Sequence, residues 1–178
     1  SYWKRSLELY SAAKDLIPSG WSLLMPDLHS NIDLLAALRD PLRLCLDLVD
    51  MPKLMDTLFE QSIEVVRTIH DRLSLASGRP TLPATLQSDF CCLLGPEMFR
   101  RWIVPTLEAE SEIVGDSVFH WDGPDAIKHL SDICSIKGIY AVSYVPGTGH
   151  GSHVDYMELF REVQAHGMGV LVSGTPEE

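Results

Sequence analysis

The chain has 178 residues, 46% of them hydrophobic and 22% charged, which is typical of a globular protein and excludes disordered, collagen-like and low-complexity classes. Its 25 Asp and Glu residues outnumber its 14 Lys and Arg residues, and the net charge of −11 leaves no basic cluster for nucleic acid or for an anionic membrane surface. No run of the sequence approaches the roughly 18 consecutive apolar residues that a membrane span requires.

At this length one hydrophobic core can form, and we expect a single domain over residues 1–178. The chain has four cysteines, none of them in a CxxC pair. This usage fits a reducing compartment better than a disulfide framework, so a cytoplasmic location is expected. The cysteines are Cys45, Cys91, Cys92 and Cys134.

About the first 80 residues are predicted to be mainly helical. Apolar side chains recur at spacings of three and four, as one face of a helix requires, in segments that begin at residues 2, 32, 41 and 52. Asp40 followed by Pro41 is a typical helix start. Gly78 is a typical helix end.

Five short apolar segments are predicted to be β-strands, and the last four alternate with helices. They are Trp21–Met25, Thr85–Cys92, Ser117–His120, Gly138–Tyr144 and Gly169–Val172. The helix after the second strand carries Pro105, which must kink or interrupt it because proline has no N–H to donate. Strands that alternate with helices of roughly 10–18 residues favour parallel βαβ units, arranged either as a barrel or as a doubly wound sheet.

The expected fold class is therefore α/β, either of the (β/α)8 TIM-barrel type or a doubly wound sheet. A full barrel needs eight strands, and the sequence shows about five, so an incomplete barrel is expected. Thr175–Glu178 has an N-cap residue, a first-turn proline and two acids, which favours a helix that continues the barrel. An intact small open sheet is the alternative. The sheet edges of a partial barrel would favour association into a homo-oligomer.

Active sites of parallel α/β folds lie at the carboxyl ends of the strands. Asp89, His120 and Asp122 are the candidate catalytic residues, because they follow consecutive predicted strands and a parallel sheet brings such positions to one end. The loop Gly147–Gly151 is expected to form the rim of the same cavity. The candidate substrate-binding residues are His29, Tyr144, Gly147 and His150.

His120 and Asp122 are separated by one residue, so on a strand both side chains point to the same side. They are candidate ligands of one divalent metal ion, or a base with the acid that orients it. The alternative is that these polar residues only cap helices or face solvent. Trp121 between them is expected to pack in the barrel wall. The histidines predicted to lie at the surface of helices are His70, His129 and His166.

Three stretches of the chain resemble the uroporphyrinogen decarboxylase superfamily. Asn31–Pro52 resembles the family's helical segment that ends in a "dl-x-d-x-P" turn. Ser88-Asp89 with Gly95–Pro105 resembles the "SD…SPe-x-f-r-x-f-x-x-P" stretch. His120–Gly123 with Gly138–Gly147 resembles the paired strands that follow. Together these stretches cover nearly the whole chain.

This resemblance implies a (β/α)8 barrel, of which the chain would be the middle and later portion, and one of two chemistries. One branch of the family decarboxylates acetate side chains of a tetrapyrrole and needs no cofactor. The other transfers methyl groups to or from a corrinoid protein, commonly with zinc. Its thiol-methylating members carry His-x-Cys and a later Cys, whereas this chain has His120-x-Asp122 and, at the later position, Ser173–Thr175.

The leading hypothesis is therefore a uroporphyrinogen decarboxylase-like enzyme whose partner is a small-molecule tetrapyrrole or a corrinoid protein. Two alternatives stay open. One is a non-catalytic barrel fragment or binding subunit, and the other is a metal-dependent barrel hydrolase.

Overall fold

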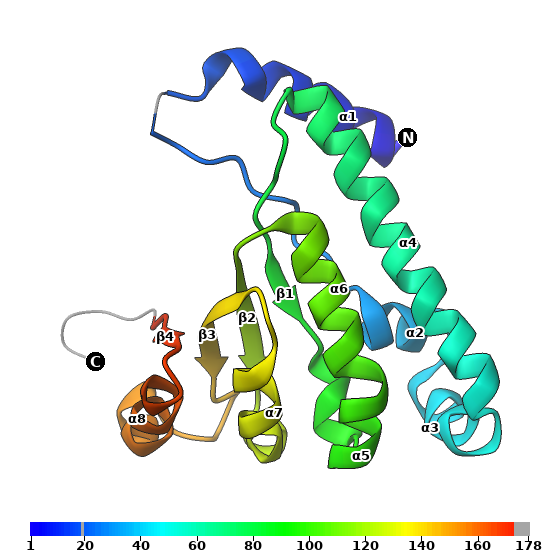
Figure 1. The fold of residues 1–178 in the computed structure, drawn as a ribbon, viewed down its shortest axis with the longest axis vertical. Coiled ribbons are helices and arrows are strands. Elements are labelled where there is room, and N and C mark those ends of the chain that lie inside the picture. Colours follow the sequence, from blue (N-terminus) through cyan, green and yellow to red (C-terminus); the bar gives the residue numbers. More distant parts are fainter. Residues whose placement is uncertain (19, 173–178) are drawn as a thin grey trace.

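The fold is α/β and is built on a parallel sheet (Figure 1). The computed structural model describes residues 1–18 and 20–172. In this part of the chain the sheet has four strands in the order β1-β2-β3-β4, and each strand is parallel to its neighbours, as predicted for the last four segments. The strands are β1 (Thr85–Gln87), β2 (Ser117–Asp122), β3 (Ile139–Val145) and β4 (Gly169–Val170).

The described residues before the sheet form four helices, as predicted. They are α1 (Tyr2–Leu16), α2 (Asn31–Arg39), α3 (Pro41–Asp50) and α4 (Pro52–Ser77). The carboxylate of Asp40 caps α3 by accepting the backbone N–H groups of Leu42 and Arg43. Gly78 ends α4 in the left-handed conformation, with a φ of +66°. The predicted helix start at Asp40 and the predicted helix end at Gly78 are therefore confirmed.

Helical segments connect the strands. After β1 come the 3₁₀ turn η1 (Asp89–Leu93) and a helix in three parts, namely α5 (Pro96–Met98), the π-helical turn η2 (Phe99–Ile103) and α6 (Val104–Val114). Pro105 explains this interruption, because it cannot donate the backbone hydrogen bond that a regular α-helix needs there. The later connections are η3 (Pro124–His129) with α7 (Leu130–Ser135), and η4 (His153–Tyr156) with α8 (Met157–Ala165).

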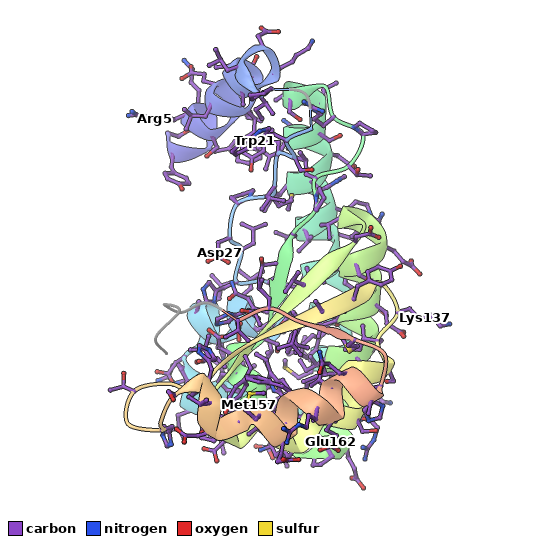
Figure 2. The ribbon with its side chains drawn as sticks, turned by 90° about the vertical axis from the view of Figure 1, so that its left-hand side faces the viewer. Arg5, Trp21, Asp27, Lys137, Met157 and Glu162 are labelled. Carbon is purple, nitrogen blue, oxygen red and sulfur yellow. The ribbon has the colours of Figure 1, made fainter. Side chains whose placement is uncertain are left out.

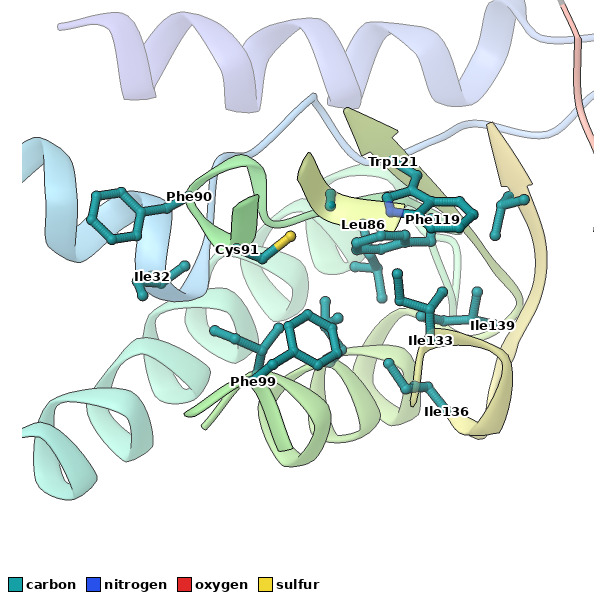
Figure 3. Packing of buried hydrophobic residues seen from close by; sticks show 14 of the residues in the cluster. Ile32, Leu86, Phe90, Cys91, Phe99, Phe119, Trp121, Ile133, Ile136 and Ile139 are labelled. Atoms are coloured by element: carbon teal, nitrogen blue, oxygen red, sulfur yellow. The ribbon is translucent and has the colours of Figure 1, made fainter. Parts of the chain in front are cut away.

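The helices bury one face of the sheet much more than the other. In β2, Phe119 and Trp121 are buried, whereas the alternate residues His120 and Asp122 are half-buried. Figure 3 shows Phe119 and Trp121 in the same cluster of buried side chains as Phe99. The core therefore lies between the sheet and its helices. The opposite side of the sheet, which we call the open face, carries His120 and Asp122.

Trp21–Met25 is not a strand, contrary to the prediction. Trp21 is 71% exposed, and the buried residue of this run is Met25. The Met25 N–H donates to the Pro83 carbonyl at 2.9 Å, but no ladder of hydrogen bonds follows. A short apolar run is compatible with several structures, and this one is an irregular connection from α1 to α2 (Figure 2). The described sheet consequently has four strands rather than about five.

The predicted strand Thr85–Cys92 is a strand only as far as Gln87. Beyond that residue the backbone turns into η1, because the carboxylate of Asp33 accepts the N–H groups of Asp89 and Phe90 at 2.9 Å each. Those two donors are then satisfied by a side chain instead of a neighbouring strand. The end of β1 is therefore set by a residue 56 positions earlier in the chain.

Two of the three helical histidines are buried, contrary to the prediction, whereas His166 is exposed. His70 accepts a backbone N–H from the segment before β1 at 3.4 Å. His129 stacks on Phe99 with ring centroids 4.1 Å apart, and its Nε2 donates to the Cys91 carbonyl at 3.1 Å. Both imidazoles satisfy backbone groups where chain segments meet, which explains their burial.

No helix within the described ranges is long and apolar enough to cross a membrane. The predicted helix start at Thr175–Glu178 lies outside the described residues.

Candidate functional site

A cavity of about 490 Å³ lies on the open face of the sheet, alongside β1. In Figure 2 the α1–α2 connection, marked by Asp27, is on the side of the sheet opposite to Lys137, which precedes β3. The Met25 N–H of this connection donates to the Pro83 carbonyl before β1, and the Asn31 amide donates to the carbonyl of Gln87, the last residue of β1. The connection therefore runs along β1 to its carboxyl end, where parallel α/β folds bind ligands. The residues that line the cavity are Leu24, Met25, Asp27, His29, Thr85, Gln87, Asp89 and His120.

Two of the lining residues are neighbours on the sheet. Gln87 of β1 pairs with His120 of β2 in the parallel register, so both side chains project from the open face. The Gln87 amide donates to the Asp27 carboxylate at 2.7 Å. This hydrogen bond holds the α1–α2 connection over the sheet and gives the cavity its second wall.

His29, Asp33 and Asp89 form a cluster whose ligand atoms all lie within 4.8 Å of one another. The Nδ1 atom of His29 is 3.7 Å from Oδ2 of Asp33 and 3.7 Å from Oδ2 of Asp89. His29 and Asp89 line the cavity, whereas Asp33 is buried in the first turn of α2. Because Asp33 binds the backbone of η1, the same carboxylate that ends β1 also sets the position of Asp89.

The pKa of Asp89 is raised above its ordinary value, first by burial and then by the nearby carboxylate of Asp33. His120 and His29 act in the opposite direction, and Asp122 adds to the rise. One oxygen of Asp89, Oδ1, is buried without a hydrogen-bond partner among the described residues. Asp89 is therefore suited to exchange a proton with a bound molecule, or to be held ionised by a cation.

The His29–Asp33–Asp89 cluster is a better place for a divalent cation than the predicted ligands. One imidazole nitrogen and two carboxylate oxygens form a mixed ligand set, which suits Zn²⁺ or Mn²⁺ better than Mg²⁺, a cation that prefers oxygen ligands. His120 and Asp122 share the open face of β2, but no third ligand joins them within the described part of the chain. A zinc site with two thiolate ligands therefore does not fit His120 and Asp122. The later position, Ser173–Thr175, lies outside the described residues.

Of the candidate catalytic residues, Asp89 and His120 line the same cavity, together with His29. Asp122 follows two positions after His120 and acts on the pKa of Asp89 without lining the cavity. Their catalytic and binding roles remain predictions.

The other candidate residues lie away from this cavity. Tyr144 faces the helices, where it is 1% exposed and packs edge-on against Trp121 at 5.4 Å. Its position follows from the alternation of side chains along β3. Trp121 packs in the core, as predicted. Gly147 and His150 lie in the exposed loop after β3, and the expected rim Gly147–Gly151 does not border the cavity as described.

Sequence reasoning did not select Asp33 or Glu110, which the structure connects to the site. Asp33 lies four residues after His29, a spacing that places two side chains on one face only if the helix begins earlier than predicted. Glu110 lies within the predicted helix after Gly95, where an acidic residue is usually solvated. Neither position carries a local signal that separates it from a surface acid.

No protein family, curated protein or solved structure was found to match this chain.

Proposed function

We propose that this chain forms part of a (β/α)8-type barrel of the uroporphyrinogen decarboxylase superfamily, and that it acts in methyl transfer to or from a corrinoid protein. One observation carries the proposal. Carboxylate and imidazole side chains from three separate segments, represented by His29, Asp89 and His120, meet in one cavity on the open face of a parallel sheet. In a barrel this face is the interior, and substrates bind at its carboxyl end.

The strand arrangement supports a barrel over a doubly wound sheet. The described strands follow one another in sequential order, without the reversal of order that defines a doubly wound sheet. The two faces also differ in burial, with His120 and Asp122 on the more open one. A doubly wound sheet has helices on both faces, and its strands read as nearly continuous hydrophobic runs.

The charge of the cavity favours methyl transfer over decarboxylation of a tetrapyrrole. The lining includes Asp27 and Asp89 and, as far as the chain is described, neither lysine nor arginine. Carboxylates repel a substrate that carries several acetate groups, and its charge has no cationic side chain to meet here. A corrinoid, whose peripheral side chains are largely amides, is not repelled in this way.

The residues of the cavity have separate roles in this proposal. His120 accepts the proton that a thiol loses when its sulfur takes the methyl group, and Asp89 exchanges protons beside it. His29 and Asp33 hold Asp89 in place and complete the ligand set for a cation. A divalent cation bound there would lower the pKa of a bound thiol.

Decarboxylation is the second candidate function, and the raised pKa of Asp89 favours it. A carboxyl group that keeps its proton can deliver it to the carbon atom from which CO₂ has departed. This reaction needs no cofactor.

A methyl-transfer assay tests the proposal on the full chain. Methylcobalamin and 2-mercaptoethanol serve as donor and acceptor, with and without Zn²⁺ or Mn²⁺, and cobalamin absorbance reports the transfer. We expect Asp89→Asn and His120→Ala to lower the rate about 100-fold. The control is Asp116→Asn, which removes an exposed carboxylate at the amino end of β2 and should leave the rate unchanged.

A parallel incubation with uroporphyrinogen distinguishes the two candidates, with the products separated by chromatography. Decarboxylated products in place of methyl transfer select the second candidate. Neither reaction from a folded protein, or equal losses in the site variants and in Asp116→Asn, contradicts the proposal.

A further inference from the structure

Glu110 lies outside the cavity but is hydrogen-bonded to Ser30 and Asn31, at the end of the α1–α2 connection that lines the cavity. The residue is in the middle of α6 and is 0% exposed. Its Oε2 atom accepts hydrogen bonds from the Ser30 hydroxyl at 3.0 Å and from the Asn31 amide at 3.4 Å. Its other oxygen, Oε1, is buried and has no hydrogen-bond partner among the described residues. Glutamate is almost never fully buried unless it is paired, and here only one of its two oxygens has hydrogen-bond partners among the described residues.

Asn31 links Glu110 to the sheet, because it is hydrogen-bonded to both. Its amide nitrogen also donates to the carbonyl of Gln87, the last residue of β1, at 2.9 Å. Its Oδ1 atom accepts the N–H of Ile32 at 2.7 Å. The φ of Asn31 is +45°, in the left-handed region that asparagine adopts more readily than most residues other than glycine. The hydrogen bonds from Asn31 to Glu110 and Gln87 stabilise the residue in this conformation.

Ser30 and Asn31, which donate hydrogen bonds to Glu110, lie between His29 and Asp33 of the His29–Asp33–Asp89 cluster in the sequence. His29 directly precedes Ser30, and Asp33 follows Asn31 by two positions in the first turn of α2. Asp33 in turn binds the N–H of Asp89 at 2.9 Å. A displacement of Ser30 or Asn31 therefore moves the whole cluster.

We propose that Glu110 is a positioning residue of the site, which holds Ser30 and Asn31 against the end of β1 and thereby sets the geometry of the His29–Asp33–Asp89 cluster. The inference rests on the proposed function only in taking this cluster as part of the working site. An alternative role, as a core residue that supports α6 alone, would leave the cluster unaffected by changes at Glu110.

The ionisation of Glu110 gives the proposal a readout. Burial raises the pKa of Glu110 to about 7, the hydrogen bonds from Ser30 and Asn31 oppose this rise, and the carboxylate of Asp33 in α2 adds to it. Near neutrality the side chain therefore gains a charge in a place where water cannot solvate it. If Glu110 positions α2, the cluster responds to that charge.

Three variants separate positioning from core stability. Glu110→Gln keeps the shape and an acceptor oxygen but cannot ionise. Glu110→Ala removes the contacts. Glu112→Gln, at an exposed position of the same helix, is the matched control.

The readout is the backbone amide resonance of Phe90, whose N–H is bound by Asp33 at 2.9 Å. NMR follows it from pH 5 to pH 9, together with the carboxyl carbon of Glu110. In the unmodified chain we expect a step in the pH dependence of the Phe90 amide chemical shift, and its midpoint should equal that of the Glu110 titration. Glu110→Gln is expected to lose this step and keep the low-pH position, whereas Glu110→Ala shifts the resonance at every pH. Glu112→Gln should match the unmodified chain.

A step that persists in Glu110→Gln overturns the proposal, as does an unshifted Phe90 amide in a folded Glu110→Ala variant. If Glu110→Ala does not fold, the comparison of Glu110→Gln with the unmodified chain decides alone. The measurement needs no turnover, so a failure of the methyl-transfer assay leaves it valid. A failure here likewise leaves the proposed function untouched.

Discussion

Replacing Glu110 by glutamine is expected to remove a pH dependence from the free energy of unfolding. Burial raises the pKa of Glu110 to about 7 in the folded chain, compared with an ordinary value of 4.5. Between these pH values the folded state holds the proton that the unfolded state has released, so stability falls as the pH rises. The contribution of uncharged Glu110 is complete below about pH 4.5 and is lost as the pH rises through about 7.

The two pKa values, about 7 and 4.5, set the size of the effect. Each pH unit between them corresponds to about 1.4 kcal/mol, so the chain loses about 3 kcal/mol from pH 4 to pH 8 through this group. Burial lowers the pKa of His129, which acts in the opposite direction, and the raised pKa of Asp89 acts in the same direction. Both groups are present in the chain and in the variant, so their contributions cancel in the comparison.

Urea unfolding at pH 5 and pH 8 measures the difference by linear extrapolation. From pH 5 to pH 8, Glu110→Gln should gain about 2–3 kcal/mol relative to the unmodified chain, with no change in the urea dependence. Glu112→Gln should follow the unmodified chain at both pH values. A stability difference that stays constant across this range would refute the reasoning, because Glu110 would then have the same pKa in the folded and unfolded states.

Asp33→Asn is expected to lower the free energy of unfolding by about 1–3 kcal/mol, because two N–H groups lose a charged acceptor. It should also lower the pKa of Asp89, because the Asp33 carboxylate contributes to raising it. An unchanged Asp89 titration by carbon NMR would contradict this contribution of Asp33. Gly138→Ala should destabilise the chain by more than about 1 kcal/mol, since its φ is +85° and a Cβ would lie 2.5 Å from a serine hydroxyl. Gly95→Ala, whose Cβ would meet nothing within 4 Å, is its control, and equal unfolding temperatures of the two would argue against this reasoning. His129→Gln should reduce the loss of stability as the pH falls below about 6.5, because burial lowers the pKa of this histidine. Parallel urea-unfolding profiles of the variant and the unmodified chain from pH 7 to pH 5 would rule this out.

Local sequence signals were sufficient for the helices and for the parallel order of the last strands. Asp40 and Gly78 begin and end helices because a capping carboxylate and a left-handed residue act within a few positions of themselves. Trp21–Met25 failed as a strand because a run of five residues, four of them apolar, carries no period that separates a strand from a partly exposed connection. The early end of β1 could not be predicted, since the acceptor for its next two donors is Asp33, 56 positions away.

The candidate site could be predicted only where it follows strand ends. Asp89 and His120 reach one cavity because adjacent parallel strands carry them to the same place. Asp33 and Glu110 belong to helices, and their roles depend on how α2 and α6 meet the end of β1. Tyr144 was predicted beside the cavity because strand ends share an edge, but the alternation of side chains along the strand turns it toward the helices.

The hydrogen bonds around the site also determine when it forms during folding. Ser30 and Glu110 are 80 positions apart, and Asp33 and Asp89 are 56 positions apart. Closing loops of this length costs chain entropy before any contact compensates for it, so local helices such as α4 are expected to form first. Destabilising substitutions such as Glu110→Ala or Asp33→Asn should then accelerate unfolding and leave the folding rate nearly unchanged. The candidate site would be the last part of the described chain to become native.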